Sequence, residues 1–237
     1  MRKQNALFAC AAAFVSILGS GAASHSPEEK LVPISRAALC VTEGTITELS
    51  GHRLSVTVPK MRAYLYAITP QSVEAHFKYL GSTGNEARLG SGELRRQFGF
   101  KLRAQDACNL VYAMWRIEPD SKLVVSVKRN AGQHTSAECG NRGYQNVKPR
   151  RSKPVPSLKP EDAHALRAEM RGAEMRVFVD DELVWEGSMG NDVLKIDGPI
   201  GIRSDNARLE LELRAAQPLG RLLAQADGCR SGPDDSD

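Results

Sequence analysis

The sequence predicts an all-β protein built as an antiparallel two-sheet sandwich. Apolar and polar residues alternate with a period of two in many short stretches, which is typical of half-buried strands. Turn signals separate these stretches, and helical periodicity is scarce. Because each antiparallel sheet has to bury one apolar face, two sheets packed face to face are the expected arrangement.

A central hairpin is the strongest local prediction in the first half of the chain. The stretch 110–117 is apolar at almost every position, which favours a central strand covered on both faces. The turn Glu118-Pro119-Asp120-Ser121 then returns the chain through a second strand at 123–127. Alternation predicts further strands at 54–58, 73–79 and 98–102.

The second half begins with a proline-rich loop near residues 145–160. The strand pattern resumes after it without a second signature of its own, so a domain boundary there is the less favoured alternative. Alternation predicts a three-stranded meander at 166–170, 175–179 and 183–185, and closing strands at 200–202 and 209–213. One or two helical turns are expected at 219–226, and a helical start at 91–96.

The first residues have the layout of a secretory signal peptide, predicted to span 1–24. Arg2 and Lys3 precede an uncharged apolar stretch at 6–18, and small residues follow. The stretch is shorter than the roughly 20 residues that span a bilayer, which disfavours a retained anchor. Most of it also follows Cys10, which disfavours a lipoprotein. We therefore expect a periplasmic or secreted protein with no membrane span after cleavage.

The exported chain is expected to form one domain. Residues 25–39 are predicted to be an exposed N-terminal segment, 40–229 a single β-sandwich, and 230–237 a disordered acidic tail. The formal net charge falls from +4 to +2 when Arg2 and Lys3 leave. So small a charge argues against nucleic acid as a partner.

Four cysteines remain after the signal is removed, and an even count in an exported chain favours disulfides. The cysteines have no C-x-x-C spacing and no neighbouring histidine, which argues against a zinc site. Three connectivities are open. We favour Cys108 with Cys139, which ties the central hairpin to the loop that leaves it, and Cys40 with Cys229, which joins the N-terminal and C-terminal strands.

Two stretches of the second half, V-F-V-D-D-E-L-V-W-E-G (177–187) and G-P-I-G-I-R-S-D-N-A-R-L-E-L-E-L (198–213), support a resemblance. They resemble the closing strands of concanavalin A-like, or laminin G-like, jelly rolls, and the likeness extends over about 53–214. L-R-A-Q-D-x-C-N (102–109) is similar to a stretch shared by exported bacterial proteins of no known function. The resemblance implies a jelly roll. It leaves function open, because the superfamily includes lectins, carbohydrate-binding modules, glycoside hydrolases, polysaccharide lyases and adhesive domains.

The richest polar cluster lies around the predicted central strand. Sugars are held by amide, carboxylate and guanidinium hydrogen bonds, with an aromatic ring under their apolar face. Tyr112 and Trp115 supply rings, although packing in the core is the more common role of aromatics on such a strand. An Arg103–Asp106 ion pair and an Asn109 turn cap are the corresponding structural alternatives. The predicted ligand-binding residues are Arg103, Asp106, Asn109 and Arg116.

For two other pairs of residues, a chemical role competes with a simpler structural role. Glu210 and Glu212 share one strand face, as an acid and base pair would, but flanking arginines favour an outward face of alternating charge. Asp205 and Asn206 offer calcium ligands, but a tight turn with a left-handed Asn206 is favoured. No other cofactor is expected.

The favoured function is therefore a non-catalytic, exported carbohydrate-binding or surface-interaction module, whose partner is a polysaccharide or a cell-envelope component. A glycan-cleaving enzyme of the same fold, either a glycoside hydrolase or a polysaccharide lyase, is one alternative. A structural envelope protein is another. The scattered histidines and the absence of a nucleophile elbow argue against other enzyme classes.

Overall fold

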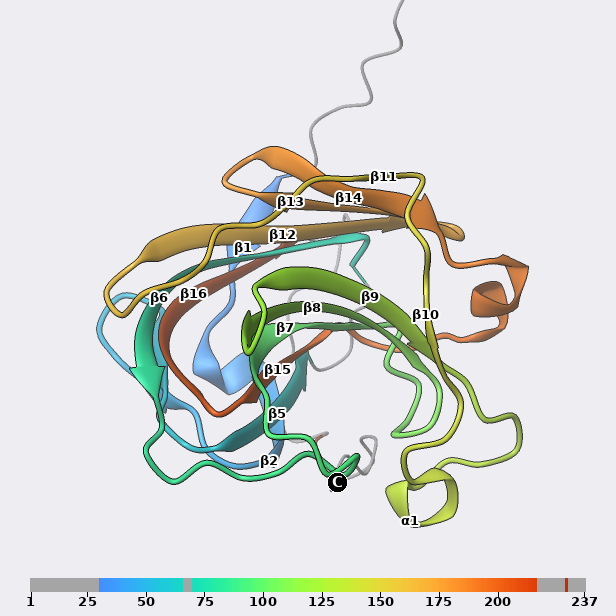
Figure 1. Cartoon of the computed structure of the whole chain (residues 1–237), viewed down its shortest axis with the longest axis horizontal. Helices are drawn as coiled ribbons and strands as arrows, with labels where there is room; N and C mark the ends of the chain where they lie inside the picture. Colours follow the sequence, from blue (N-terminus) through green and yellow to red (C-terminus); the bar gives the residue numbers. More distant parts are fainter. Residues whose placement is uncertain (1–29, 66–69, 217–228, 230–237) are drawn as a thin grey trace, which may run out of the picture.

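The computed structural model describes residues 30–65, 70–216 and 229. Within these residues the chain forms two stacked antiparallel sheets, here called A and B (Figure 1). This arrangement is the predicted jelly-roll sandwich. The signal peptide, the tail at 230–237 and the helical turns expected at 219–226 lie outside the described residues.

Sheet A has the strand order β11-β14-β13-β12-β6-β16-β4-β3, and β1 also pairs with β16. Its strands are β1 (Leu31–Pro33), β3 (Thr47–Glu48), β4 (Arg53–Val56), β6 (Ser72–Ser82), β11 (Arg151–Ser152), β12 (Ala163–Arg171), β13 (Glu174–Val179), β14 (Glu182–Ser188) and β16 (Ala207–Ala216).

Sheet B has the order β10-β9-β8-β7-β15-β5-β2. Its strands are β2 (Leu39–Glu43), β5 (Lys60–Leu65), β7 (Arg96–Leu102), β8 (Leu110–Glu118), β9 (Lys122–Lys128), β10 (Tyr144–Asn146) and β15 (Gly201–Asp205). Three short helices, η1 (Arg36–Ala38), α1 (Ser136–Cys139) and η2 (Asn191–Lys195), lie in the connections. No helix of the described part is long and apolar enough to cross a membrane.

The predicted hairpin and meander are both present. Strands β8 and β9 pair directly, and β12, β13 and β14 follow one another in sheet A. The proline-rich segment contains two short strands, β10 and β11, because its backbone joins the edges of both sheets. No helix starts at 91–96; that stretch is a loop that leads into β7.

The expectation of an exposed segment at 25–39 is wrong for its second half. Strand β1 pairs with β16, and Ile34 is 0% exposed within the core. Leu39 starts β2 and is also buried. The apolar side chains of this segment cover the sandwich near β16, so residues 31–39 belong to the domain.

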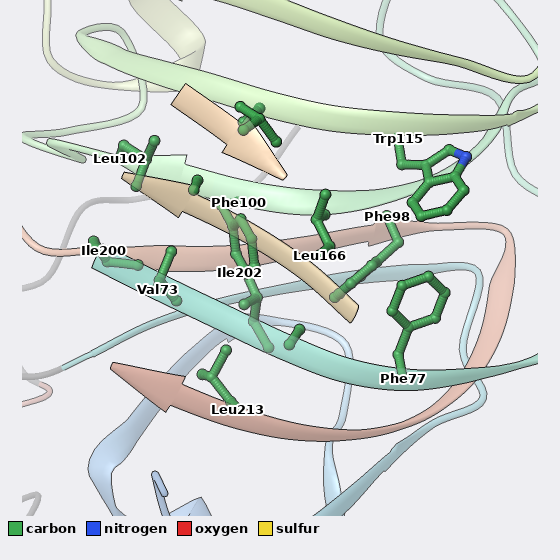
Figure 2. Packing of buried hydrophobic residues seen from close by; sticks show 14 of the residues in the cluster. Val73, Phe77, Phe98, Phe100, Leu102, Trp115, Leu166, Ile200, Ile202 and Leu213 are labelled. Carbon is green, nitrogen blue, oxygen red and sulfur yellow. The ribbon is translucent and has the colours of Figure 1, made fainter. Parts of the chain in front are cut away.

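The core fills the space between the inward faces of the sheets (Figure 2). Phe77 of sheet A packs edge-on against Trp115 of sheet B, with ring centroids 5.7 Å apart, and also contacts Phe98 at 5.3 Å. Trp115 is therefore a core residue, which was the structural alternative for it. Strand β8 is buried on its other face as well, where Leu110, Tyr112 and Met114 form a second cluster with Ala104. Its position as a central strand covered on both faces is confirmed.

Two disulfides join the pairs that we favoured from the sequence. Cys108 is bonded to Cys139, with Cα atoms 5.9 Å apart, and Cys40 is bonded to Cys229, with Cα atoms 5.5 Å apart. The first bond ties the start of β8 to α1. The second attaches the chain near its C-terminal end to β2.

Candidate functional site

The outer face of sheet B carries three rows of side chains that run across neighbouring strands. The register aligns them because residues paired across a sheet point to the same side. Row one is Cys40, Tyr64, Gly201, Lys101, Tyr112, Ser126 and Asn146. Row two is Glu43, Arg62, Arg203, Gly99, Met114 and Val124. Row three is Lys60, Asp205, Gln97, Arg116 and Lys122.

A buried charge network occupies the middle of this face. Asp205 is 0% exposed; its Oδ1 accepts a hydrogen bond from Arg62 Nη2 at 2.6 Å. Its Oδ2 accepts from Gln97 Nε2 at 2.6 Å and from Arg203 Nε at 2.8 Å. Burial alone would raise the pKa of Asp205, but the charges of Arg203 and Arg62 outweigh it and hold the pKa well below its ordinary value of 3.8. Asp205 is therefore a fixed anion that orients two guanidinium groups.

Two tyrosines form an aromatic platform beside this network. The rings of Tyr112 and Tyr144 stack with centroids 5.9 Å apart and an interplanar angle of 27°. The guanidinium of Arg203 lies 5.5 Å from the centre of the Tyr112 ring, and Lys128 Nζ lies 5.0 Å from that of Tyr144. Cations against these ring faces fix the platform from two sides.

A pocket of about 270 Å³ opens over the platform. Its lining combines aromatic, amide, hydroxyl and cationic groups, and the carboxylate of Glu93 already pairs with Arg95. Principal lining residues are Arg95, Gln97, Tyr112, Met114, Arg116, Ser126, Asn141, Tyr144, Asn146 and Arg203. Arg95 and Arg203 are already paired, with Glu93 and Asp205, so the suitability of the pocket for an anion depends on Arg116.

Arg116 is the cation of this pocket with spare bonding capacity. Within the described residues its guanidinium makes no hydrogen bond or ion pair, and its Nε is buried. Burial, and then the like charge of Arg95, lower the pKa of Arg116 from its ordinary value. An anion bound in the pocket would offset both the burial of Arg116 and its repulsion from Arg95. It would accept charge-assisted hydrogen bonds in place of those that water accepts from an exposed guanidinium.

Gly99 lies in row two between Arg203 and Met114, two residues of the pocket lining. An added Cβ would lie 2.1 Å from the backbone oxygen of Ala113, so the close approach of β7 and β8 requires glycine at this position.

Of the four residues predicted to bind ligand, the structure places only Arg116 in this lining. Asp106 and Asn109 bond to each other at 2.9 Å beside the Cys108–Cys139 disulfide, and Asp106 also contacts His134 Nδ1 at 2.7 Å. Asn109 thus caps the turn, which was its structural alternative. Arg103 donates to the carbonyl oxygen of Ile196 at 3.0 Å and does not pair with Asp106. Ligand binding by these three residues stays a prediction.

Glu210 and Glu212 lie on the outer face of sheet A, on the other side of the sandwich from the pocket. They share a strand face, and both line a wide, shallow depression of about 580 Å³. Glu210 lies 3.6 Å from Arg53 Nη1, and Glu212 accepts a hydrogen bond from Arg214 Nε at 2.8 Å. They belong to a face of paired, alternating charge.

The two candidate calcium ligands are used by the chain itself. Both oxygens of Asp205 accept hydrogen bonds from the buried network described above. Asn206 has a φ of 58° and holds the backbone of Ala87 at 2.8 Å through its Oδ1. This is the left-handed turn favoured from the sequence. Residues 30–65, 70–216 and 229 contain no group of three or more His, Cys, Asp or Glu side chains arranged to hold a metal ion.

Sequence reasoning missed most of the pocket lining. Gln97, Tyr144, Asn146 and Arg203 come from three different strands, β7, β10 and β15, and no local motif links the three. The register of sheet B is what brings them together. One usable signal was the pair of polar residues, Gln97 and Lys101, on the outward side of a strand whose other neighbours are strongly apolar.

No family model matches the sequence, and no curated protein matches it either. Solved structures do match in fold. A carbohydrate-binding module, CBM66 from Bacillus subtilis, is 13% identical with a TM-score of 0.50, over 75% of this chain and 94% of that chain. LamAcat from Zobellia galactanivorans is 14% identical with a TM-score of 0.43, over 71% and 79% of the two chains. At such identities the likeness establishes the jelly-roll fold alone.

Proposed function

We propose that the protein is an exported, non-catalytic module that binds an acidic polysaccharide in the pocket on the outer face of sheet B. One observation carries the proposal: Arg116, a guanidinium without a partner among the described residues, stands beside a stacked tyrosine pair. An aromatic face takes the apolar side of a sugar ring, and a guanidinium takes a carboxylate or sulfate in a bidentate manner. The amide of Asn146, which also lines the pocket, would bind hydroxyl groups of the sugar.

Two further observations support this function. The fold is shared with a carbohydrate-binding module, which makes a glycan a reasonable ligand class. Two disulfides fit an oxidising compartment, the periplasm or the cell exterior. The glutamate pair suggested for catalysis, Glu210 and Glu212, lies on the opposite sheet from the pocket.

Binding to polygalacturonate and to neutral dextran tests the proposal. The protein should bind the acidic polymer and not the neutral one. Arg116→Met should weaken binding about tenfold or more, because a hydrogen bond to a charged group is worth about 1.5–3 kcal/mol. The matched control is Arg176→Met, which removes an exposed arginine from sheet A and should leave affinity unchanged.

Two results would overturn the proposal. Equal losses in both variants would mean that binding follows net charge rather than the pocket. New reducing ends or unsaturated products from any bound glycan would instead favour the glycan-cleaving alternative. If the protein does not bind polygalacturonate, a binding assay with dextran sulfate distinguishes a sulfate-binding pocket from one that binds no polyanion.

A further inference from the structure

The segment 87–95, which leads into β7, supplies part of the pocket lining, including Glu93 and Arg95. Its own hydrogen bonds form a tight turn: Leu89 N–H donates to the carbonyl oxygen of Glu93 at 2.9 Å, and Gly92 N–H donates to that of Leu89 at 2.8 Å. Leu89 is buried, whereas the other side chains between 88 and 94 are exposed. A segment with so little buried surface depends on polar contacts to keep its position.

The side chain of Asn206 holds both ends of this segment. Asn206 lies between β15 and β16 and is 1% exposed. Its Oδ1 accepts a hydrogen bond from Ala87 N–H at 2.8 Å, and its Nδ2 donates to the carbonyl oxygens of Ala87 and Arg95, each at 2.9 Å. Because the side chain both accepts and donates, the position requires a carboxamide. The three bonds close the segment at its base.

The backbone at Asn206 is fixed separately from its side chain. Its N–H donates to the carbonyl oxygen of Pro59 at 2.7 Å, and its own carbonyl oxygen accepts from Thr83 N–H at 3.3 Å. Its φ of 58° lies in the left-handed region, which glycine adopts without steric cost. Asn206→Gly therefore removes the three side-chain bonds and keeps the turn between β15 and β16.

The segment carries two opposite charges that act on Arg116. Burial lowers the pKa of Arg116, the positive charge of Arg95 lowers it further, and the negative charge of Glu93 raises it. In the structure Glu93 pairs with Arg95 and also accepts a hydrogen bond from Ser91 Oγ at 3.3 Å. The position of the segment thus decides which guanidinium the carboxylate of Glu93 contacts.

We propose that Asn206 is a positioning residue for the pocket. Its three hydrogen bonds keep segment 87–95 in the arrangement in which Glu93 pairs with Arg95 and Arg116 is available to an anionic ligand. When the segment is released, Glu93 pairs with Arg116 and occupies the ligand-binding guanidinium from within the chain. The effect on ligand binding rests on the proposed function, whereas the change of partner by Glu93 needs no ligand.

Nuclear magnetic resonance of the free protein tests the change of partner. In Asn206→Gly the signal of Arg116 Nε–H should shift, and adding Glu93→Gln should return it toward its wild-type position. Amide hydrogen exchange at 88–94 should be faster in both variants, because the segment is released in both. The matched control is His52→Gly, which changes an exposed residue with a φ of 63° and should alter neither measurement.

Binding of polygalacturonate tests the consequence for the pocket. Affinity should fall about fivefold or more in Asn206→Gly, because Glu93 then takes the hydrogen bonds of Arg116. Adding Glu93→Gln should restore it to within about twofold of wild type, which a purely structural role of Asn206 would not allow. Glu93→Gln alone should change affinity about twofold or less, because Glu93 already pairs with Arg95.

Three results contradict the proposal: an Arg116 signal that stays in place in Asn206→Gly, exchange at 88–94 as slow as in wild type, or an equal effect of Glu93→Gln in both backgrounds. If Asn206→Gly does not fold, Asn206→Asp is measured in the same way, because it keeps the acceptor for Ala87 N–H and loses both donors. If no form of the protein binds polygalacturonate, the proposed function fails, while the Arg116 signal and the amide exchange still decide the role of Asn206.

Discussion

The outer faces of the two sheets follow the same sequence rule but have different surroundings. On β16, Leu209, Leu211 and Leu213 point inward, and the outward charged residues are only partly buried or exposed. On β7, Phe98, Phe100 and Leu102 point inward in the same way. The outward Gln97 and Lys101, however, are 4% and 1% exposed.

The difference in burial changes how much each charged side chain contributes to the free energy of unfolding. Solvent screens the ion pairs on sheet A, so that each contributes little, about 0–1 kcal/mol. On sheet B the charges are removed from water, and their pairing becomes necessary, because an uncompensated buried charge is costly. Alternation thus predicts which side chains face the core but not whether the opposite face remains in water.

Removing the anion of sheet B should have the largest effect. Asp205→Asn removes the buried carboxylate that Arg62 and Arg203 share, and should cost about 3–5 kcal/mol of the free energy of unfolding. Urea denaturation measures it. A loss below about 1 kcal/mol would mean that this face behaves like the exposed face of sheet A.

The same variant has a defined pH dependence. The pKa of Asp205 is lowered in the folded state, so the unfolded chain takes up a proton first as pH falls below the ordinary value of 3.8. The stability that Asp205 contributes is complete above that range and decreases below it. The gap in stability between wild type and Asp205→Asn should therefore narrow in acid. A gap that is constant or widens down to the lowest workable pH contradicts the assignment.

Removing the Cys108–Cys139 disulfide should have the next largest effect on stability. Cys108→Ser with Cys139→Ser opens a loop whose ends are separated by 31 residues. We expect a loss of about 2–4 kcal/mol, mainly because the unfolded chain gains freedom. Thermal unfolding with and without reductant measures this loss of stability. Reductant should lower the melting temperature of the variant less than that of the wild type, because the variant lacks this bond. Binding that survives in the folded variant would show that the bond supports stability rather than the pocket.

Gly99→Ala should have an intermediate effect. The added Cβ meets the Ala113 backbone oxygen at 2.1 Å, so β7 or β8 has to shift, at a cost of about 1–3 kcal/mol. Polygalacturonate affinity should fall as well, because β7 and β8 carry Gln97, Tyr112 and Arg116 of the pocket lining. Calorimetric melting and affinity measured on one sample separate the two effects. An unchanged melting temperature would show that the strands adjust freely.

Neutralising a charge on sheet A should have the smallest effect. Glu212→Gln breaks the pair with Arg214 in a partly exposed setting, so we expect a change within about 1 kcal/mol and reduced sensitivity to salt. It is the direct counterpart of Asp205→Asn. A loss as large as that of Asp205→Asn would remove the contrast between the two faces.

Several elements could be predicted because their signals are local. The apolar stretch 110–117 and the turn after it define the β8–β9 hairpin without reference to the rest of the chain. Strands β2 and β5 were not predicted, although Lys60 and Arg62 alternate with Met61 and Ala63 as in a half-buried strand. Alternation does not predict that the outward Arg62 is buried, because that burial depends on the covered outer face of sheet B.

By itself the sequence determined the all-β class and the inward residues of most strands, whereas it left three cysteine connectivities open. These depend on short-range periodicity and on the geometry of neighbouring strands. The tertiary structure alone decided which strands share a sheet, and thereby placed Arg116, Tyr144 and Arg203 around one pocket. The physical reason is that register and strand order are set by non-local pairing, which no local pattern encodes.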